Sequence, residues 1–383
     1  MIPDHISIPR YGDRSLADLV PSLLSALGVP GMPNRLQLEP ASRVVLFLVD
    51  GFGDEQLRGH AALAPFLHAR RGEPLTAGFP ATTVASLTSI GTGMPPGEHG
   101  LVGYTFALPG QARAFNVLTW SLYGIGPAVD LRAIVVPEQL QPQPTLFERA
   151  TAAGVSVTQL GKAFFPTSGF TRAAFRGGRH VTAEALDAVV TEAVRAVKDG
   201  PSLVYAYYAG LDAAGHVAGV DSDAWRRELA AVDRAAGQMA ERLPAGSLLL
   251  ATGDHGMTDL KEYQRLELDE DPALRAGVRL LAGEARARHV YTQPGAATDV
   301  LAAWRARLGE RMAVWTRAEA IDLGLFGPRV RDEVRPRIGD VVAAAYGPAG
   351  IVQRAVDPAQ GRFNGHHGSF TPAEQLVPFV VSR

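Results

Sequence analysis

The feature that most constrains the fold is an apolar run, VVLFLV, at residues 44–49, which ends in Asp50. Six consecutive apolar residues cannot alternate between core and solvent, so the run predicts a strand buried on both faces, inside a parallel sheet. In open α/β folds, ligands bind at the edge where such strands end. We therefore expect Asp50 to lie at the functional edge of the sheet.

Two further apolar strands are predicted, and each runs into an Asp with a His one or four residues later. The pairs are Asp212 with His216, after SLVYAYY, and Asp254 with His255, after SLLLAT. A single Asp-His pair is common in turns, and an Asp and a His four residues apart can also stabilise a helix start. The joint placement after three strands favours a shared site beside Asp50.

A glycine-flanked loop near the C-terminus, NGHHGS, adds His366 and His367. Glycine lets the backbone approach a site closely. Three Asp and three His are oxygen and nitrogen ligands suited to Zn²⁺, or to Mn²⁺ and Fe in oxygen-rich sites. This number also fits two divalent metal ions about 4 Å apart, each with a position open for substrate. The sequence therefore predicts a site for two metals.

Two threonines, Thr82 and Thr83, precede a small-residue segment that is typical of a helix, residues 84–92. A hydroxyl at a helix start lies near free backbone N–H groups, which is a suitable place for a phosphate. Threonine at this position also commonly does no more than cap the helix. On the residues alone, both interpretations stand.

The remaining chain alternates strand and helix patterns and predicts an α/β fold. We expect a three-layer sandwich, with a mostly parallel central sheet, helices on both faces and a smaller inserted cap. At 383 residues the chain exceeds the usual single-domain size. We assign residues 1–256 and 345–383 to the catalytic core and residues 257–344 to the cap. The Pro-rich segment 105–145 is expected to be an irregular excursion over the site.

Within this plan, several elements can be placed along the sequence. We expect helices over Asp54 to Arg71, over Ala183 to Lys198, and from about Ala296 to Leu308. The cap is expected to contain a hairpin that pairs residues 278–281 with residues 288–291.

The amino-acid composition limits the classes of partner and the kinds of site that we expect. The net charge of −2, with both signs interspersed, gives no reason to expect binding to a nucleic-acid polymer or to a membrane surface. The absence of cysteine excludes disulfides and thiolate metal sites. The N-terminal sequence lacks a signal-peptide pattern, and no stretch approaches the roughly 20 apolar residues of a membrane span. We expect a cytoplasmic protein with a small-molecule substrate.

Taken together, these motifs resemble the alkaline phosphatase superfamily, and most closely its type I phosphodiesterase/nucleotide pyrophosphatase branch. The matching stretches occur in the family's order and span residues 44–369. They are VDGFGD, PATTVASLTSIGTG followed by PPGEHG, LDAAGH, TGDHGM and GHHGS.

The resemblance implies a hydrolase that uses two metal ions, usually zinc, and a covalent phospho-threonine intermediate. It implies that Thr83 is the nucleophile, because Thr92-Gly93 matches the family's Thr-Gly pair, and that His367 rather than His366 is a ligand, because His367 precedes Gly-Ser. The implied ligands of one metal are Asp50, Asp254, His255 and Thr83, and those of the other are Asp212, His216 and His367.

One position departs from the branch. Where its members carry an Asn that holds a phosphoryl oxygen, this chain has Tyr104, a possible substrate contact of different reach. The positive charge of two divalent cations equals the negative charge of three carboxylates and an alkoxide, so the site is about neutral. A neutral site favours a phosphodiester or pyrophosphate substrate over a monoester, whose dianion needs additional positive charge. Folding of Lys162, Arg172 or Arg337 into the site would reverse that argument.

Four alternatives share these residues. Three are enzymes on the same site, a phosphomonoesterase, a phosphonate hydrolase and, less favoured because the chain has no cysteine, a sulfatase. The fourth is a metal-binding scaffold without activity, which a lost ligand would support. None of the six Asp and His ligands is missing from the sequence.

Overall fold

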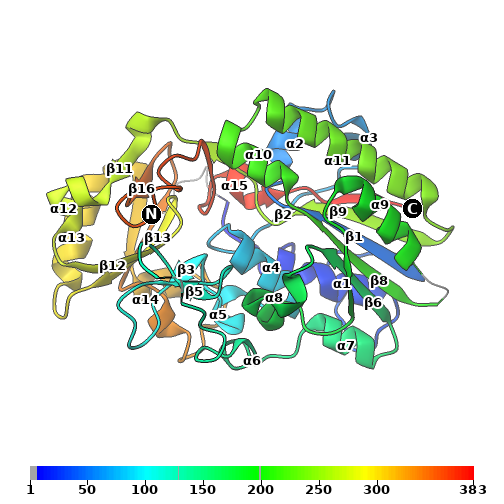
Figure 1. Cartoon of the computed structure of the whole chain (residues 1–383), viewed down its shortest axis with the longest axis horizontal. Helices are drawn as coiled ribbons and strands as arrows, with labels where there is room; N and C mark the ends of the chain where they lie inside the picture. Colours follow the sequence, from blue (N-terminus) through cyan, green and yellow to red (C-terminus); the bar gives the residue numbers. More distant parts are fainter. Residues whose placement is uncertain (1–6, 128, 198–199) are drawn as a thin grey trace.

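The computed structural model describes residues 7–127, 129–197 and 200–383. Lys198, the end of one expected helix, and residues 1–6 of the N-terminal segment lie outside these ranges. At the centre is a six-stranded sheet with the order β19-β9-β1-β8-β6-β7 (Figure 1). Its strands are β1 (Arg43–Val49), β6 (Ser156–Gly161), β7 (Arg179–Thr182), β8 (Ser202–Tyr208), β9 (Ser247–Gly253) and β19 (Val380–Ser382).

The sheet is parallel except for β19, which runs antiparallel to β9. Strand β1 is central, with β8 on one side and β9 on the other, and Val49 pairs with both Tyr208 and Gly253. The three strands therefore end level with one another. This register confirms the mostly parallel sheet and decides where the residues after each strand lie.

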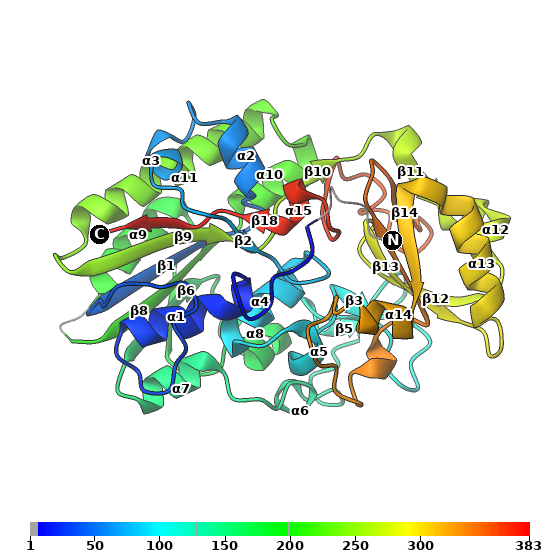
Figure 2. The same ribbon diagram turned by 180° about the vertical axis from the view of Figure 1, so that it is seen from behind.

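Alternate side chains of β1 fill two separate cores, which is why its sequence is apolar throughout. Val44, Leu46 and Leu48 pack into one core, and Val45, Phe47 and Val49 pack into the other. Figures 1 and 2 show the helices on both sides of the sheet. The first core holds α1 (Leu19–Ala26), α4 (Thr83–Thr92), α7 (Leu146–Ala152) and α8 (Gly169–Ala174); the second holds α2 (Asp54–Gly59), α3 (Pro65–Ala69), α9 (Leu186–Ala196) and α11 (Asp223–Arg242).

A second, antiparallel sheet lies beside the ends of the central strands (Figures 1 and 2). It contains the expected hairpin, in which Leu281 pairs with Val290. The order is β12-β13-β15-β14, and α13 packs on it through the buried Trp304. The elements are β12 (Val278–Gly283), β13 (Ala287–Thr292), β14 (Met312–Thr316), β15 (Val341–Ala345), α12 (Pro272–Arg275), α13 (Ala297–Leu308) and α14 (Arg317–Asp322).

Two expected elements differ in the structure. The helix expected over Asp54 to Arg71 is divided into α2 and α3. The division has a local cause, because Ala64 precedes Pro65 and adopts φ −132° and ψ 58°, and a residue before proline is disfavoured in the helical region. The excursion 105–145 contains a small antiparallel sheet as well as irregular chain, formed by β3 (Thr105–Phe106), β4 (Phe115–Asn116) and β5 (Ser121–Leu122).

None of the helices within the described ranges combines the length and hydropathy needed to cross a bilayer.

Short elements complete the described chain. The short elements are η1 (Leu16–Asp18), β2 (Leu75–Thr76), α5 (Pro96–His99), α6 (Pro137–Leu140), η2 (Phe165–Thr167), α10 (Gly210–Ala218), β10 (Thr258–Asp259), η3 (Glu262–Gln264), β11 (Arg265–Glu267), η4 (Leu268–Glu270), η5 (Gly309–Arg311), η6 (Arg335–Arg337), β16 (Gly350–Val352), β17 (Gly365–His366), α15 (Pro372–Gln375) and β18 (Leu376–Val377).

Candidate metal centre and active-site cavity

The level ends of β1, β8 and β9 bring the three Asp side chains to one edge of the sheet. Asp50 directly follows β1, and Asp254 directly follows β9. Helix α10 begins two residues after β8 and carries Asp212 and His216. Residues four apart in a helix share a face, and the His216 Nε2 lies 3.4 Å from the Asp212 Oδ1.

Asp50, Asp254 and His255 form one buried group, with ligand atoms within 4.8 Å of one another. The His255 Nε2 lies 3.4 Å from the Asp50 Oδ1 and 3.8 Å from the Asp254 Oδ2. The Thr83 Oγ1 lies 3.2 Å from the same nitrogen. Four polar atoms from three separate parts of the chain thus surround one small space.

Asp212, His216 and His367 form a second group of the same kind. The two groups are adjacent, because the rings of His255 and His367 stack with their centroids 3.6 Å apart. The neighbouring His366 turns away, and its Nε2 lies 3.0 Å from the Phe363 carbonyl oxygen. The structure therefore brings His367, and not His366, together with Asp212 and His216.

The tautomer of each histidine in the two groups is set by the backbone. In all three, the Nδ1 faces a carbonyl oxygen, which can only accept a hydrogen bond. Nδ1 therefore carries the hydrogen, and the lone pair of Nε2 is free, as metal ligation requires. The pairs are His216 with Gly365 at 2.8 Å, His255 with Gly256 at 2.9 Å, and His367 with Ala81 at 2.9 Å.

The carboxylates also keep one oxygen free. Tyr207 donates to the Asp50 Oδ2 at 2.5 Å, and the backbone N–H groups of Gly51 and His255 donate to the Asp254 Oδ1 at 3.1 and 3.0 Å. The other oxygen of each, together with the Asp212 Oδ1, is buried and accepts no hydrogen bond within the described ranges. Such oxygens are costly unless a cation contacts them, so these residues fit divalent metals.

Burial acts on the two kinds of ligand in opposite directions. It raises the pKa of the Asp50 and Asp212 carboxyls, and the charge of Asp254 raises that of Asp50 further. Burial also raises the pKa of Asp254 to about 6 and lowers that of His255 to about 4. Carboxylates that repel one another beside neutral imidazoles are stabilised by cations, which supports the same conclusion.

Thr82 and Thr83 have different surroundings. Thr82 holds the N-cap position of α4, but its side chain accepts no capping hydrogen bond. Its Oγ1 instead donates to the Glu284 Oε1 at 2.5 Å. Thr83 begins the helix, and its hydroxyl faces His255. Neither hydroxyl acts as a helix cap.

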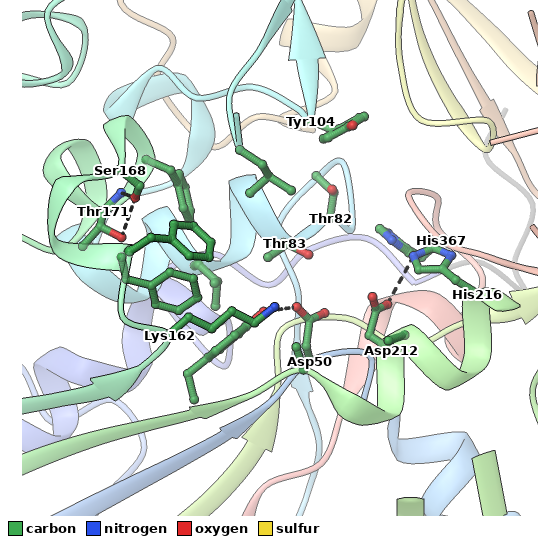
Figure 3. Close-up of a pocket in the computed structure, with 18 of the residues that line it drawn as sticks. Asp50, Thr82, Thr83, Tyr104, Lys162, Ser168, Thr171, Asp212, His216 and His367 are labelled. Carbon is green, nitrogen blue, oxygen red and sulfur yellow. Dashed lines mark hydrogen bonds and ion pairs between the residues drawn. The ribbon is translucent and has the colours of Figure 1, made fainter. Parts of the chain in front are cut away.

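Both groups open into a cavity of about 540 Å³. Figure 3 shows Thr83 between Asp50 and Thr82, with Tyr104 on the far side of Thr82. The Tyr104 hydroxyl accepts a hydrogen bond from the Asn116 Nδ2 at 2.8 Å. Aromatic side chains line much of the remaining wall, namely Tyr123, Phe164, Phe165, Phe170, Phe175, Tyr205, Tyr207 and Phe363.

Of the three cations that could alter the charge of the site, Lys162 alone lines the cavity. Arg172 forms an ion pair with Glu138 at 2.9 Å. Arg337 donates to the Gly100 carbonyl oxygen at 2.7 Å. Figure 3 shows the Lys162 side chain extending toward Asp50, so the charge count of the metals and their ligands does not by itself favour a diester over a monoester.

Sequence reasoning missed Glu284 and Asn116. Glu284 lies in the turn between β12 and β13, and Asn116 lies on β4. The hairpin itself was predictable, but nothing in its sequence indicates that its turn contacts Thr82. The pairing of Asn116 with Tyr104 likewise depends on the small sheet inside the excursion 105–145.

A substitution at Gly51 tests whether the close contact between Gly51 and Asp212 is needed for metal binding. Its φ is +71°, and a Cβ there would lie 2.9 Å from both the Cα and the Cβ of Asp212. We expect Gly51→Ala to displace Asp212 and to weaken Zn²⁺ binding by at least about tenfold, measured by equilibrium dialysis.

Gly154 is the matched control, since its φ is +84° but a Cβ there would meet nothing within 4 Å. Gly154→Ala should cost about 1–2 kcal/mol of stability through backbone strain and keep the Zn²⁺ affinity. Equal affinities for the two variants would contradict the close approach of Gly51 to Asp212.

Comparisons with known proteins agree with this geometry. The family model described as type I phosphodiesterase / nucleotide pyrophosphatase matches residues 44–370. Among solved structures, murine ectonucleotide pyrophosphatase/phosphodiesterase 5 is similar, with a TM-score of 0.68 and 19% identity over 89% of this chain and 88% of that chain.

A second structure of the murine protein, an inactive threonine-to-alanine variant in complex with AMP, has a TM-score of 0.68 and 18% identity over 89% and 88% of the two chains. The human protein has a TM-score of 0.63 and 18% identity over 89% and 87%. No curated protein sequence matches the chain.

Proposed function

Because the chain belongs to the type I phosphodiesterase/nucleotide pyrophosphatase family, and is therefore a hydrolase of phosphate ester bonds, we propose a specific reaction for it. It cleaves phosphodiester or pyrophosphate bonds in nucleotide-like substrates through a covalent phospho-threonine intermediate. The observation that carries this proposal is the position of Thr83, whose hydroxyl lies 3.2 Å from the Nε2 of His255, beside the group whose Asp50 and Asp254 each keep an oxygen without a hydrogen bond. The inactive murine relative carries a threonine-to-alanine substitution, which also supports a nucleophilic threonine.

The proposal includes two divalent cations, of which Zn²⁺ fits the ligand set, held by the two groups. Asp50, Asp254, His255 and Thr83 would hold one, and Asp212, His216 and His367 would hold the other. When bound, such ions lower the pKa of the nucleophile and stabilise the charge of the leaving oxygen.

The proposed reaction has two steps, in which Thr83 is the nucleophile and other residues orient the metal ligands. The Thr83 Oγ attacks phosphorus, the bond from phosphorus to the leaving oxygen breaks, and the leaving group departs with a proton. Water then attacks the phospho-threonine, which restores the Thr83 hydroxyl and releases a phosphate monoester. Tyr207 holds the Asp50 carboxylate, and the carbonyl oxygens at the three Nδ1 atoms hold the imidazoles, so the site is organised before substrate binds.

In this proposal, the Tyr104 hydroxyl donates a hydrogen bond to a phosphoryl oxygen of the substrate. Its oxygen accepts from Asn116, and the phenol lines the cavity. A hydroxyl whose oxygen is held in this way can direct its hydrogen at a phosphoryl oxygen. The phenol of Tyr104, the residue just before the excursion 105–145, would thus replace the Asn of the family pattern.

A turn of the second sheet and the excursion each contribute part of the wall of the proposed substrate pocket. The cap assigned to residues 257–344 contributes Glu284 to the cavity wall, and the excursion contributes Tyr104's neighbours Leu118 and Tyr123. Aromatic rings suit a nucleobase, which can stack on them. AMP bound to the murine relative supports a nucleotide-like substrate.

Hydrolysis of bis-p-nitrophenyl phosphate by the Zn²⁺-loaded protein tests the reaction. We expect Thr83→Ala to lower kcat by at least about a thousandfold, as loss of a nucleophile does. Thr82→Ala should stay within about tenfold of the wild type, since it removes one hydrogen bond to Glu284. A Thr83→Ala variant of full activity would assign the nucleophile elsewhere, and an inactive wild type would refute the reaction.

Substitution of Tyr104 tests the phosphoryl contact. Tyr104→Phe keeps the ring and removes the donor, so we expect kcat/KM for the same diester to fall by about tenfold to a hundredfold. Asn116→Ala should cost less, because the phenol remains but is no longer oriented. Unchanged kcat/KM in Tyr104→Phe would show that the phenol does not contact the substrate.

A further inference from the structure

The proposed chemistry leaves one buried acid in the cavity without a role. Glu284 lies in the β12–β13 turn, lines the cavity and is 8% exposed. Unlike Asp50, Asp212 and Asp254, it belongs to neither group of metal ligands. A buried carboxyl beside a reacting phosphate affects which charges the cavity accepts.

The contacts of Glu284 place it next to the nucleophile. Its Oε1 accepts the hydrogen bond from Thr82, the residue before Thr83. It also packs against the loop that carries His367, since a Cβ on Gly368 would lie 2.9 Å from the Glu284 Cβ. Because adjacent Cα atoms are about 3.8 Å apart and each Thr side chain adds about 2.4 Å, the carboxyl lies within roughly 13 Å of a phosphorus atom bonded to Thr83.

The charge of the buried Arg288 lowers the pKa of this carboxyl, but the guanidinium makes its hydrogen bonds to other groups. The Arg288 guanidinium donates to the Gly283 and Ile351 carbonyl oxygens and to the Gln360 side chain. Lys162 also lines the cavity but is exposed to solvent, so its field is screened more strongly than that of a buried group. Burial raises the pKa of Glu284 to about 7, so Glu284 carries its negative charge above that pH, and this charge is less screened than that of Lys162.

On the basis of the function proposed above, we propose that Glu284 is a specificity residue that excludes phosphate monoester dianions from the site. A diester phosphate carries one negative charge, whereas a monoester carries close to two above neutral pH. The additional charge is repelled by Glu284 across the cavity. The consequence is that the enzyme releases its monoester product instead of hydrolysing it to inorganic phosphate.

Glu284→Gln tests this proposal, because the amide oxygen can still accept from Thr82 while the charge is lost. The readout is the ratio of kcat/KM for p-nitrophenyl phosphate to kcat/KM for bis-p-nitrophenyl phosphate. We expect Glu284→Gln to raise this ratio by about tenfold, the size of one charge at this separation in a partly screened cavity. An unchanged ratio would overturn the proposal.

Two further variants separate charge from structure. The hydrogen bond from Thr82 lowers the Glu284 pKa, so the variants are compared at about pH 9, where the carboxyl stays ionised without it. Under that condition Thr82→Val removes the hydrogen bond and keeps the charge, so it should change both substrates by the same factor. Glu310→Gln removes an exposed acid outside the cavity wall and should keep the wild-type ratio. A rise of the ratio in Thr82→Val equal to that in Glu284→Gln would assign the effect to the position of Thr82 and overturn the charge argument.

Binding provides a readout without turnover. Calorimetry on the Zn²⁺-loaded protein above neutral pH should show that Glu284→Gln tightens the binding of inorganic phosphate by a factor about tenfold larger than that for dimethyl phosphate, because phosphate carries one more negative charge. Equal affinities of both proteins for inorganic phosphate would contradict the proposal. A wild type that hydrolyses neither substrate would instead refute the proposed function, so the two failures are distinguishable.

Discussion

The register of three parallel strands determines the chemistry of this chain. Because Val49 pairs with Tyr208 and with Gly253, β1, β8 and β9 end level, and the residues that follow them meet at one edge. Three carboxylates result, each with a buried oxygen that accepts no hydrogen bond within the described ranges. An arrangement of this kind is unfavourable unless cations neutralise it. The fold therefore favours metal binding, and in the function proposed above such metals would activate Thr83.

Local features adapt the strand ends to this task. Gly51 adopts positive φ and lets the start of α10 approach β1. Backbone carbonyl oxygens fix the tautomers of His216, His255 and His367. These contacts come from residues next to the ligands in sequence or from loops that pack on them. The site is thus held by the backbone, which requires little rearrangement when a charged ligand binds.

Much of this could be predicted from the sequence, for physical reasons that particular residues show. The apolar run before Asp50 has no polar face, so it fits only a strand covered on both sides. Once the strands are placed, the location of the Asp and His residues that come after them is also predicted. The roles of Glu284 and Asn116 could not be predicted, because each depends on a contact between segments far apart in the chain, at 2.5 Å to Thr82 and 2.8 Å to Tyr104. Pro65 indicates a break in the helix at Ala64, but the helical pattern of the surrounding residues favoured one continuous helix.

The measurement that tests the central claim most directly is anomalous X-ray diffraction at the zinc absorption edge, from crystals of the Zn²⁺-reconstituted protein. The account predicts two anomalous peaks, one among Asp50, Asp254 and His255 and the other among Asp212, His216 and His367. A single peak, or peaks bounded by other side chains, would contradict it.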